Sequence, residues 1–397
     1  MTTLVEREKN ALFPTYDRLP IGAVTRAEGV YITTDGPDGR SARYLDAIAG
    51  LGVNALGHSH PAVVAAIREQ AGKYLHLSNL YVQEPQIVLA EKLERASGWE
   101  RTFFTNSGTE AVEGAIKLAR KVFSSETKTE IMGVANGFHG RTYAPLSVMG
   151  TSKYRDNFGP FVAGASTIPG YDPNVLEEVI TERTAAVIVE AIQGEGGIIE
   201  IPAEFVHALA ELRAKHHFLI IADEIQSGIG RTGRFFAYEH LGMKPDIVVC
   251  AKAIGGGLPL GAILTRRELA DTMRAGVHGT TFGGNALACV AGSVTLDLIE
   301  KTYMDNAAHE GDYLLRAFEQ LREAHPKSIR QVRGRGLMLG IEFTANARQV
   351  QQRLFEQHII TNVTAGEVLR MLPPLIFERK HSEELSRAIR EAVETMD

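Results

Sequence analysis

The fold is decided by residues 219–261, which read LIIADEIQSGIGRTGRFFAYEHLGMKPDIVVCAKAIGGGLPLG. Two short apolar runs here end in residues of opposite charge, since 218–222 leads into Asp223 and 247–251 leads into Lys252. Runs that are rich in β-branched residues and apolar on both alternations are typical of strands buried on both faces of a parallel sheet. Ligands bind at the carboxyl ends of such strands. We therefore expect the carboxylate and the amine to share one crevice.

This pair of groups suits the chemistry of pyridoxal 5'-phosphate. In enzymes with this cofactor, a lysine amine bonds to its aldehyde, and a carboxylate keeps the ring nitrogen protonated so that the ring accepts electrons. Each residue alone has an ordinary explanation, Asp223 as a helix cap and Lys252 as a surface amine. Lys252, however, precedes three glycines at 255–257 that leave room for a cofactor. The joint pattern favours a cofactor site, with Lys252 and Asp223 as the catalytic residues.

The same stretch resembles the signature of a known family. Its segments 223–233, DEIQSGIGRTG, and 244–262, KPDIVVCAKAIGGGLPLGA, are similar to the motifs of class III aminotransferases. These pyridoxal-phosphate enzymes act on ω-amino groups, and the likeness is to the acetylornithine aminotransferases among them. It extends over about residues 20–378. It implies transamination of N2-acetylornithine with 2-oxoglutarate, giving N-acetylglutamate 5-semialdehyde and glutamate, in arginine biosynthesis.

Length and composition set further bounds. The chain has 397 residues, 44% of them hydrophobic, which is enough for a large core and two domains. Its formal net charge of -6 argues against nucleic acid or an anionic membrane as the main partner, because both attract basic surfaces. The first ten residues carry charges where a signal peptide is apolar, so a cytoplasmic enzyme is expected. Cys250 and Cys289 have neither metal-ligand nor disulfide spacing, so we expect buried, reduced thiols and no metal.

Strands and helices alternate through the middle of the chain. Apolar runs typical of buried strands lie near 101–105, 130–135 and 185–190, with helical spacing between them. This order favours a mainly parallel, doubly wound α/β sheet. The resemblance implies the same large domain, that of a fold type I pyridoxal-phosphate transferase, together with a smaller α+β domain. We expect three segments: 1–50 joining the small domain, 51–295 forming the large cofactor-binding domain, and 296–397 forming the C-terminal small domain.

The end of the chain has its own pattern. We expect long amphipathic helices, then a strand-like segment at 332–343 and a closing helix. Ser382 is the expected N-cap of that helix, because Glu383 and Glu384 would then lie in its first turn, where the helix dipole favours acids.

A turn of small residues follows the strand expected at 101–105 and leads into a helical pattern. Free N–H groups and the helix dipole make such a turn an anion site. An ordinary helix cap would have similar residues, but Ser107, Gly108 and Thr109 also match the family's Ser-Gly-Thr. We therefore expect these three residues to bind the cofactor, with Gly108 and Thr109 at its phosphate.

An aromatic residue and an arginine follow the strand expected at 130–135, in the segment Gly-Phe-His-Gly-Arg at 137–141. An aromatic ring can lie flat on a cofactor ring, and a guanidinium can hold a carboxylate through two hydrogen bonds. A core phenylalanine and a solvated arginine are the ordinary alternatives. The resemblance favours Phe138 as the residue stacked on the cofactor and Arg141 as the residue that binds the distal carboxylate of the substrate.

The resemblance implies further cofactor contacts by Glu224, Ile225, Gln226 and Thr281, and further substrate contacts by Tyr16, Glu195, Thr280 and Arg370. Thr281 matches a threonine that binds the phosphate of the neighbouring subunit's cofactor, so a homodimer is expected. Arg370 matches the arginine that binds a carboxylate next to the reacting carbon. Glu195 matches the acid that neutralises this arginine while the ω-amino donor is bound. A purely structural ion pair is the alternative.

Other functions fit parts of the pattern. His-Gly-Thr-Thr-Phe at 278–282 resembles enzymes for a lysine precursor attached to a small acidic carrier protein, and Thr280 stands where acetylornithine enzymes commonly have serine. Ornithine and 4-aminobutyrate are alternative ω-amino donors. A decarboxylase or a racemase can use the same fold and lysine, but only a transaminase requires an amino acceptor. A binding protein without cofactor is disfavoured because the lysine, the aspartate and the phosphate turn are all present.

Overall fold

The computed structural model describes residues 4–36 and 40–395, and its centre is a seven-stranded sheet. In spatial order the strands are β4 (Arg101–Thr105), β12 (Gly261–Thr265), β11 (Ile247–Ala251), β10 (Leu219–Asp223), β7 (Thr184–Val189), β5 (Glu130–Val134) and β6 (Ala165–Ile168). Neighbours from β11 to β6 pair in parallel, whereas β12 is antiparallel to both β11 and β4. The connection 252–260 is shorter than the dozen or so residues that a parallel crossover needs, so β12 turns back. The predicted mainly parallel sheet is confirmed.

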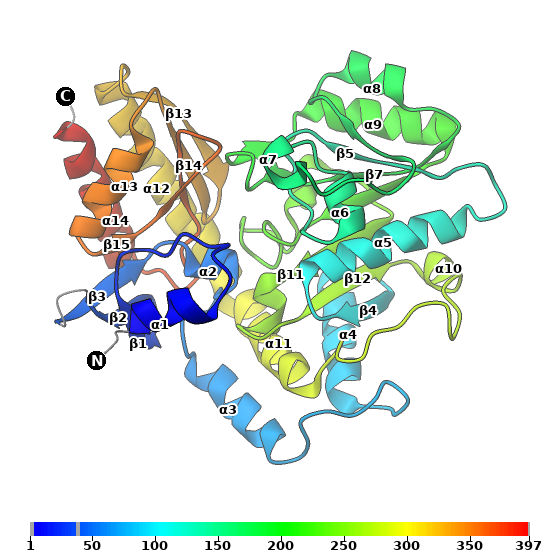
Figure 1. Cartoon of the computed structure of the whole chain (residues 1–397), viewed down its shortest axis with the longest axis horizontal. Helices are drawn as coiled ribbons and strands as arrows, with labels where there is room; N and C mark the ends of the chain where they lie inside the picture. Colours follow the sequence, from blue (N-terminus) through cyan, green and yellow to red (C-terminus); the bar gives the residue numbers. More distant parts are fainter. Residues whose placement is uncertain (1–3, 37–39, 396–397) are drawn as a thin grey trace.

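Helices cover both faces of this sheet (Figure 1). Leu219 on β10 packs in a buried cluster with α5 (Gly108–Val122), whereas the next residue, Ile220, packs in another cluster with α9 (Ala203–His216). Successive strand residues point to opposite faces, which explains why these strands are apolar on both alternations. The second cluster also includes residues of α3 (Pro61–Ala71), α4 (Glu84–Ser97), α8 (Pro173–Val179) and α11 (Ala286–Leu298).

A smaller sheet joins the two ends of the chain. It contains β1 (Ala23–Glu28), β2 (Tyr31–Asp35), β3 (Ser41–Asp46) and β15 (Ile359–Ile360) in that order. β15 pairs in parallel with β3, so that Ile359 lies opposite Leu45. Figure 1 shows the blue N-terminal strands beside the orange and red C-terminal elements. The domain boundaries themselves stay a prediction.

The C-terminal part corrects two expectations from the sequence. Segment 332–343 belongs to a hairpin of β13 (Ile329–Arg335) and β14 (Met338–Phe343), because Gly336, with φ 51°, turns the chain between them. The closing helix α14 (Arg379–Glu394) begins earlier than expected, with Glu378 as its N-cap. Ser382 is buried inside the helix. An expectation based on Ser382 therefore missed the first turn, where the Glu378 N–H donates to His381 Nδ1 at 3.0 Å.

The remaining elements include the long helix α12, which packs into the main core, and several short helices and strands. They are α1 (Leu4–Ala11), α2 (Ala49–Gly52), α6 (Tyr143–Ser147), α7 (Ser152–Arg155), α10 (Arg267–Ala270), α12 (Met304–Ala324), α13 (Ala347–Glu356), β8 (Ile192–Gln193), β9 (Ile199–Glu200), β16 (Asn362–Thr364), β17 (Val368–Met371), the 3-10 helices η1 (Ala237–Leu241) and η2 (Lys252–Gly255), and the π-helix η3 (Ile299–Tyr303). β13, β14, β17 and β16 form a four-stranded antiparallel sheet in that order.

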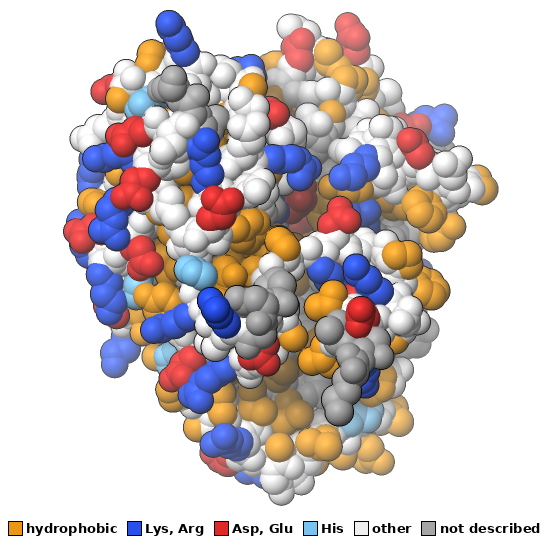
Figure 2. Space-filling model, turned by 60° about the vertical axis from the view of Figure 1, so that its left-hand side comes forward, with side chains coloured by type: hydrophobic (Ala, Val, Ile, Leu, Met, Phe, Trp, Pro, Cys, Tyr) orange, Lys and Arg blue, Asp and Glu red, His pale blue; other side chains and the backbone are white. Residues whose placement is uncertain are grey.

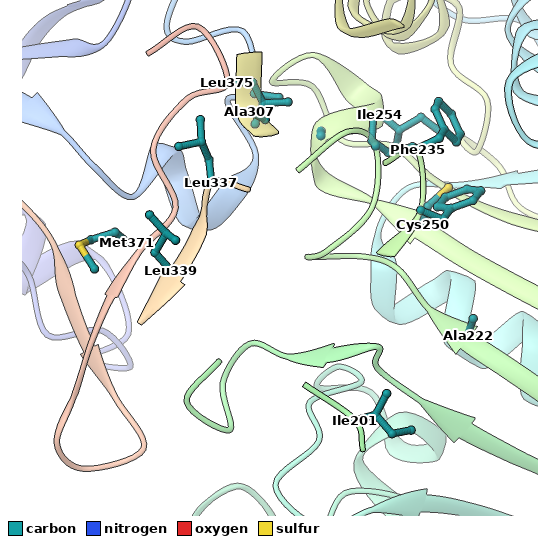
Figure 3. Packing of buried hydrophobic residues seen from close by; sticks show 14 of the residues in the cluster. Ile201, Ala222, Phe235, Cys250, Ile254, Ala307, Leu337, Leu339, Met371 and Leu375 are labelled. Atoms are coloured by element: carbon teal, nitrogen blue, oxygen red, sulfur yellow. The ribbon is translucent and has the colours of Figure 1, made fainter. Parts of the chain in front are cut away.

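One apolar core connects the large sheet with the C-terminal sheet. Figure 3 shows members of this cluster on both sides, among them Ala222 and Cys250 from the large sheet and Leu339 and Met371 from the C-terminal sheet. Cys250 and Cys289 are free and fully buried, as expected from the sequence. The shared core therefore holds the large sheet and the C-terminal sheet against each other.

The surface carries charges of both signs. On the face shown in Figure 2, basic and acidic side chains are interspersed over the N-terminal and C-terminal elements. Among the residues that the structure describes, no helix combines the length and the apolar character needed to cross a bilayer.

Candidate active site

A cavity of about 450 Å³ opens at the carboxyl ends of the central strands. Nine residues expected at the site from the sequence line it, namely Ser107, Gly108, Thr109, Phe138, Arg141, Asp223, Ile225, Gln226 and Lys252. They come from segments that directly follow β4, β5, β10 and β11. The sheet therefore brings together side chains that are far apart in the sequence.

Lys252 follows β11 directly and is held in an unusual backbone conformation. Its φ of 53° lies in the left-handed region, which costs about 1–3 kcal/mol for a residue with a side chain. Burial, followed by the positive charge of Arg370, lowers the pKa of the Lys252 amine to about 8. A substantial fraction of the amine is therefore neutral near pH 8, and only the neutral amine attacks an aldehyde.

Asp223 ends β10 and is 3% exposed. One carboxylate oxygen, Oδ1, accepts a hydrogen bond from the Ile225 N–H at 3.1 Å. The other, Oδ2, lies 2.7 Å from Nδ1 of His139. Both oxygens are thus held in fixed directions at the cavity wall, which fits a carboxylate that binds a protonated ring nitrogen.

The turn after β4 begins α5, and Ser107 is its N-cap. Ser107 Oγ accepts a hydrogen bond from the Glu110 N–H at 3.3 Å. A Cβ on Gly108 would lie 2.8 Å from a methyl group of Ile225, so only glycine allows this close approach. The first N–H groups of an α-helix have no partner within the helix, and they attract anions together with the helix dipole. This end of the cavity fits a phosphate group.

Phe138 and Arg141 lie on the segment after β5 and share an unexpected neighbour. The Arg141 guanidinium lies over the ring of Tyr154, with its central carbon 4.0 Å from the ring centroid. The same carbon is 5.4 Å from the Phe138 ring, and the two rings meet edge to face at 5.7 Å. A cation held over aromatic faces keeps its N–H groups at the guanidinium edge free for a carboxylate.

Arg370 and Glu195 form an ion pair beside the cavity. Arg370 lies on β17, is 1% exposed, and its Nη1 donates to Oε1 of Glu195. The same nitrogen donates to Oε1 of Gln226 at 3.3 Å, which links the pair to the cavity wall. Although burial raises the pKa of Glu195, Arg370 outweighs this effect and holds it below its ordinary value. Neither partner of the pair lines the cavity itself.

Four other predicted residues also lie outside the cavity lining. Glu224 points into the fold, where its carboxylate accepts from the N–H groups of Ala237 and Tyr238 and from the hydroxyl of Ser227. Thr280 Oγ1 accepts a hydrogen bond from Asn106 at 3.1 Å, whereas Thr281 and Tyr16 are exposed. The roles assigned to these four residues stay predictions.

The cavity also contains residues that sequence reasoning missed, chief among them Val53, Asn106, His139, Glu190 and the segment 258–260. Glu190 directly follows the buried strand β7, the same pattern that singled out Asp223 after β10. His139 stands beside the predicted Phe138. Both carried a detectable signal, whereas Val53 is the C-cap of the short helix α2 and carried none.

The fold and the cavity define a class of protein: a parallel sheet with a lysine and a buried carboxylate at neighbouring strand ends is the arrangement of fold type I pyridoxal-phosphate enzymes. The family model for aminotransferase class-III matches residues 14–393. Acetylornithine aminotransferases of Methanocaldococcus jannaschii and Aquifex aeolicus are 44% and 43% identical to this chain. The alignments cover 98% and 96% of this chain and 97% and 99% of the relatives. The chain belongs to the class-III aminotransferase family.

Solved structures give the same result. The ornithine aminotransferase from Toxoplasma gondii superposes with a TM-score of 0.92 at 28% identity, covering 98% of this chain and 95% of that one. The acetylornithine aminotransferase from Elizabethkingia anophelis has a TM-score of 0.86 at 30% identity and covers both chains fully (100% of each). The cofactor of the family is pyridoxal phosphate. The residues present fit it, since the cavity offers a partly neutral lysine, a buried carboxylate, an aromatic ring and a helix N-terminus.

Proposed function

We propose that this enzyme transfers the terminal amino group of N2-acetylornithine to 2-oxoglutarate, giving N-acetylglutamate 5-semialdehyde and glutamate in arginine biosynthesis. The nearness of Lys252 to both Asp223 and the Glu195–Arg370 pair carries this proposal, because it suits two substrates with different charges near the reacting carbon. The choice of donor is supported by relatives named acetylornithine aminotransferase that are 44% and 43% identical over nearly the whole chain.

The residues predicted at the cavity would have distinct parts in this reaction. When bound, pyridoxal phosphate supplies an aldehyde that takes up the amino group and a ring that withdraws electrons. Lys252 Nζ would hold this aldehyde until the donor amine displaces it, and the freed amine would then take the proton from the reacting carbon and give it to the cofactor. Asp223 holds the proton of the ring nitrogen by its negative charge. Ser107, Gly108 and Thr109 would hold the phosphate, and Phe138 would orient the ring.

The Glu195–Arg370 pair explains how one cavity accepts two unlike molecules. 2-Oxoglutarate and glutamate carry a carboxylate next to the reacting carbon, whereas the donor has a methylene group there. A buried guanidinium without a partner is costly, so Arg370 needs Glu195 while the donor is bound. When glutamate is bound, its carboxylate takes the place of Glu195. Arg141 binds the distal carboxylate in both half-reactions.

We also propose a homodimer with a second copy of this chain. Two segments joined by hydrogen bonds from Asn79 to the backbone oxygens of Thr280 and Gly283 form one apolar surface. Its large exposed side chains are Leu75, Leu77, Leu80, Tyr81, Val82, Ile87, Val277 and Phe282. Leu80 and Val82 are 88% and 89% exposed, which is characteristic of an interaction site. Thr281 lies on this surface and would reach the cavity of the partner.

The proposal also includes the division of the chain into domains and the cellular compartment of the enzyme. The segments 1–50, 51–295 and 296–397 form the N-terminal part of the small domain, the large domain and the C-terminal part of the small domain. We place the enzyme in the cytosol, because two buried free cysteines suit a reducing compartment.

A comparison of amino donors tests the proposed reaction. Acetylornithine, ornithine, lysine, 4-aminobutyrate and a lysine precursor on an acidic carrier protein are each offered with 2-oxoglutarate, and glutamate formation is followed. We expect the highest kcat/KM with acetylornithine, by about tenfold or more over free ornithine, since free ornithine brings an extra charge into the dry cavity. A higher kcat/KM for another donor would reject the assignment. Sustained product formation without any amino acceptor would indicate a decarboxylase or a racemase instead.

A further inference from the structure

Three buried ionisable side chains lie close together at the wall of the cavity, at the ends of three neighbouring strands. β10 ends in Asp223, β7 is followed directly by Glu190, and the segment after β5 carries His139. These side chains belong to residues that are 3%, 6% and 2% exposed. The mechanism above uses only Asp223. Two buried titratable groups in contact with the cavity are therefore still without a role.

His139 has one satisfied and one unsatisfied ring nitrogen. Nδ1 lies 2.7 Å from Asp223 Oδ2, whereas Nε2 is buried and has no hydrogen-bond partner among residues 4–36 and 40–395. A neutral imidazole carries a proton on only one of its two ring nitrogens. A proton on Nδ1 is required for the bond to Asp223 Oδ2, because an ionised carboxylate can only accept a hydrogen bond.

Backbone N–H groups hold both carboxylate oxygens of Glu190 in place. Its Oε2 accepts from the N–H of Phe138 at 2.9 Å, and its Oε1 accepts from the N–H of Gly194 at 3.2 Å. A Cβ on Gly137 would lie 3.1 Å from His139 Nε2 and 3.6 Å from Glu190 Oε2, so both atoms border the same small space. The carboxylate is therefore near the unsatisfied nitrogen, close enough for its charge to act on the imidazole.

We propose that His139 is a positioning residue for Asp223: a protonated imidazole whose Nδ1–H fixes and stabilises the carboxylate that serves the ring nitrogen, with Glu190 balancing its charge on the other side. Burial alone would discharge the ring, but the hydrogen bond and the charge of Asp223 outweigh it and raise the pKa of His139. Burial, opposed by His139, raises the pKa of Glu190 above its usual range.

The arrangement has a chemical purpose. A carboxylate alone in a dry cavity is poorly stabilised and free to rotate, and it would take up the ring proton instead of holding it there. A charged donor behind Asp223 keeps the negative charge in place and fixes its direction. The inference depends on the cofactor and not on the proposed donor, so a different result in the donor assay would leave it intact.

The protonation of His139 is measured directly in the apoenzyme. Nitrogen NMR of imidazole-labelled protein, with His139 assigned by comparison with His139→Asn, reports both ring nitrogens over pH 6 to 9. We expect protons on both nitrogens at pH 7 and a lower pKa of His139 in Glu190→Gln, because the nearby negative charge has been removed. A neutral ring at pH 7, with either nitrogen lacking its proton, would overturn the proposal, and an unchanged pKa of His139 in Glu190→Gln would remove Glu190 from it.

Two variants separate a positioning role from simple packing. His139→Asn keeps an N–H donor near the Nδ1 position without the charge, whereas His139→Leu removes both. Without substrate, we expect cofactor affinity to fall by about tenfold or more in the Leu variant, as for a lost hydrogen bond to a charged group, and by less in the Asn variant. We also expect kcat to fall more than the KM for the amino donor changes.

His216→Leu is the matched control. His216 makes an equally short bond, 2.7 Å from Nδ1 to Glu182, but outside the cavity, so its loss should leave cofactor affinity and kcat unchanged. If His139→Leu keeps wild-type cofactor affinity and kcat, the proposal is wrong. If His139→Leu does not fold, the Asn variant and the NMR of the wild-type protein still decide the question.

Discussion

At the scale of single residues, neighbouring charges of both signs affect the pKa of the Lys252 amine. Burial and Arg370 lower its pKa to about 8, from 10.5 for an ordinary lysine, while Glu195 and Asp223 oppose the shift. Since only the neutral amine reacts with an aldehyde, cofactor uptake by the apoenzyme should rise with pH and reach half its maximum near pH 8.

The rise of visible absorbance after mixing apoenzyme with pyridoxal phosphate measures this profile. Arg370→Gln should move the midpoint to higher pH, because a repelling positive charge has been removed. Lys252→Ala should give no such absorbance and no turnover, whereas Lys128→Ala, which removes a buried lysine outside the cavity, should behave like the wild type. A wild-type midpoint near pH 10 would contradict the prediction.

Glu195 is expected to act in only one half of the reaction. In Glu195→Gln the guanidinium of Arg370 keeps its charge but loses its ionic partner while the donor is bound. We predict that the donor half-reaction slows by about tenfold or more and that the glutamate half-reaction is unchanged or faster. Arg141→Ala should weaken substrate binding in both half-reactions. Cofactor absorbance in single turnovers separates the halves, and equal losses in Glu195→Gln would exclude the switch.

The residues that could be predicted are those whose role follows from strand ends. Asp223 and Lys252 each close an apolar run, and that local pattern was sufficient. The contact between Asp223 and His139 could not be predicted from the sequence, because it depends on the strand order, in which β7 lies between β5 and β10. The same holds for Tyr154 beside Arg141, which depends on how α7 folds back over the segment after β5.

At the scale of elements, α7 positions the guanidinium of Arg141 through Tyr154. A cation over an aromatic face gains about 0.5–2 kcal/mol, depending on its exposure. Tyr154→Leu should therefore raise the KM for both acetylornithine and 2-oxoglutarate by about threefold to tenfold, with a smaller change in kcat. Tyr154→Phe keeps the ring and should remain near the wild type. Steady-state kinetics decide, and a loss of kcat alone in Tyr154→Leu would contradict a role in binding.

The elements themselves were predictable where their pattern was local. The buried strands and the helix after Ser107 follow from apolar spacing and turn residues. The sequence does not separate β13 from β14, since the turn at Gly336 is short and β13, with arginines at 330, 333 and 335, has no apolar run that marks it as a strand of its own. The antiparallel direction of β12 depends on the length of the connection 252–260, which apolar periodicity does not reveal.

At the scale of the whole molecule, the apolar surface around Leu80 and Val82 predicts a dimer that completes the cavity. Aspartates in place of both residues would bury two charges at the interface, which is costly. We expect the double variant Leu80→Asp and Val82→Asp to be monomeric in sedimentation experiments and to bind pyridoxal phosphate at least about tenfold more weakly. Val24→Asp, at a 59% exposed site on β1, is the matched control and should stay dimeric. A monomeric wild type that retains full activity would contradict the prediction.

The pairing of β15 with β3 has a consequence for biosynthesis on the ribosome. Leu45 and Ile359 are partners in this sheet although 314 residues separate them (359 − 45 = 314). At about 5–20 residues per second, the edge of β3 waits roughly 15 to 60 s for its neighbour to emerge. An unpaired strand edge can recruit strands of other chains during that time. Nascent chains of this enzyme are therefore expected to be most prone to aggregation before residue 359 leaves the exit tunnel, and most dependent on chaperones during that interval.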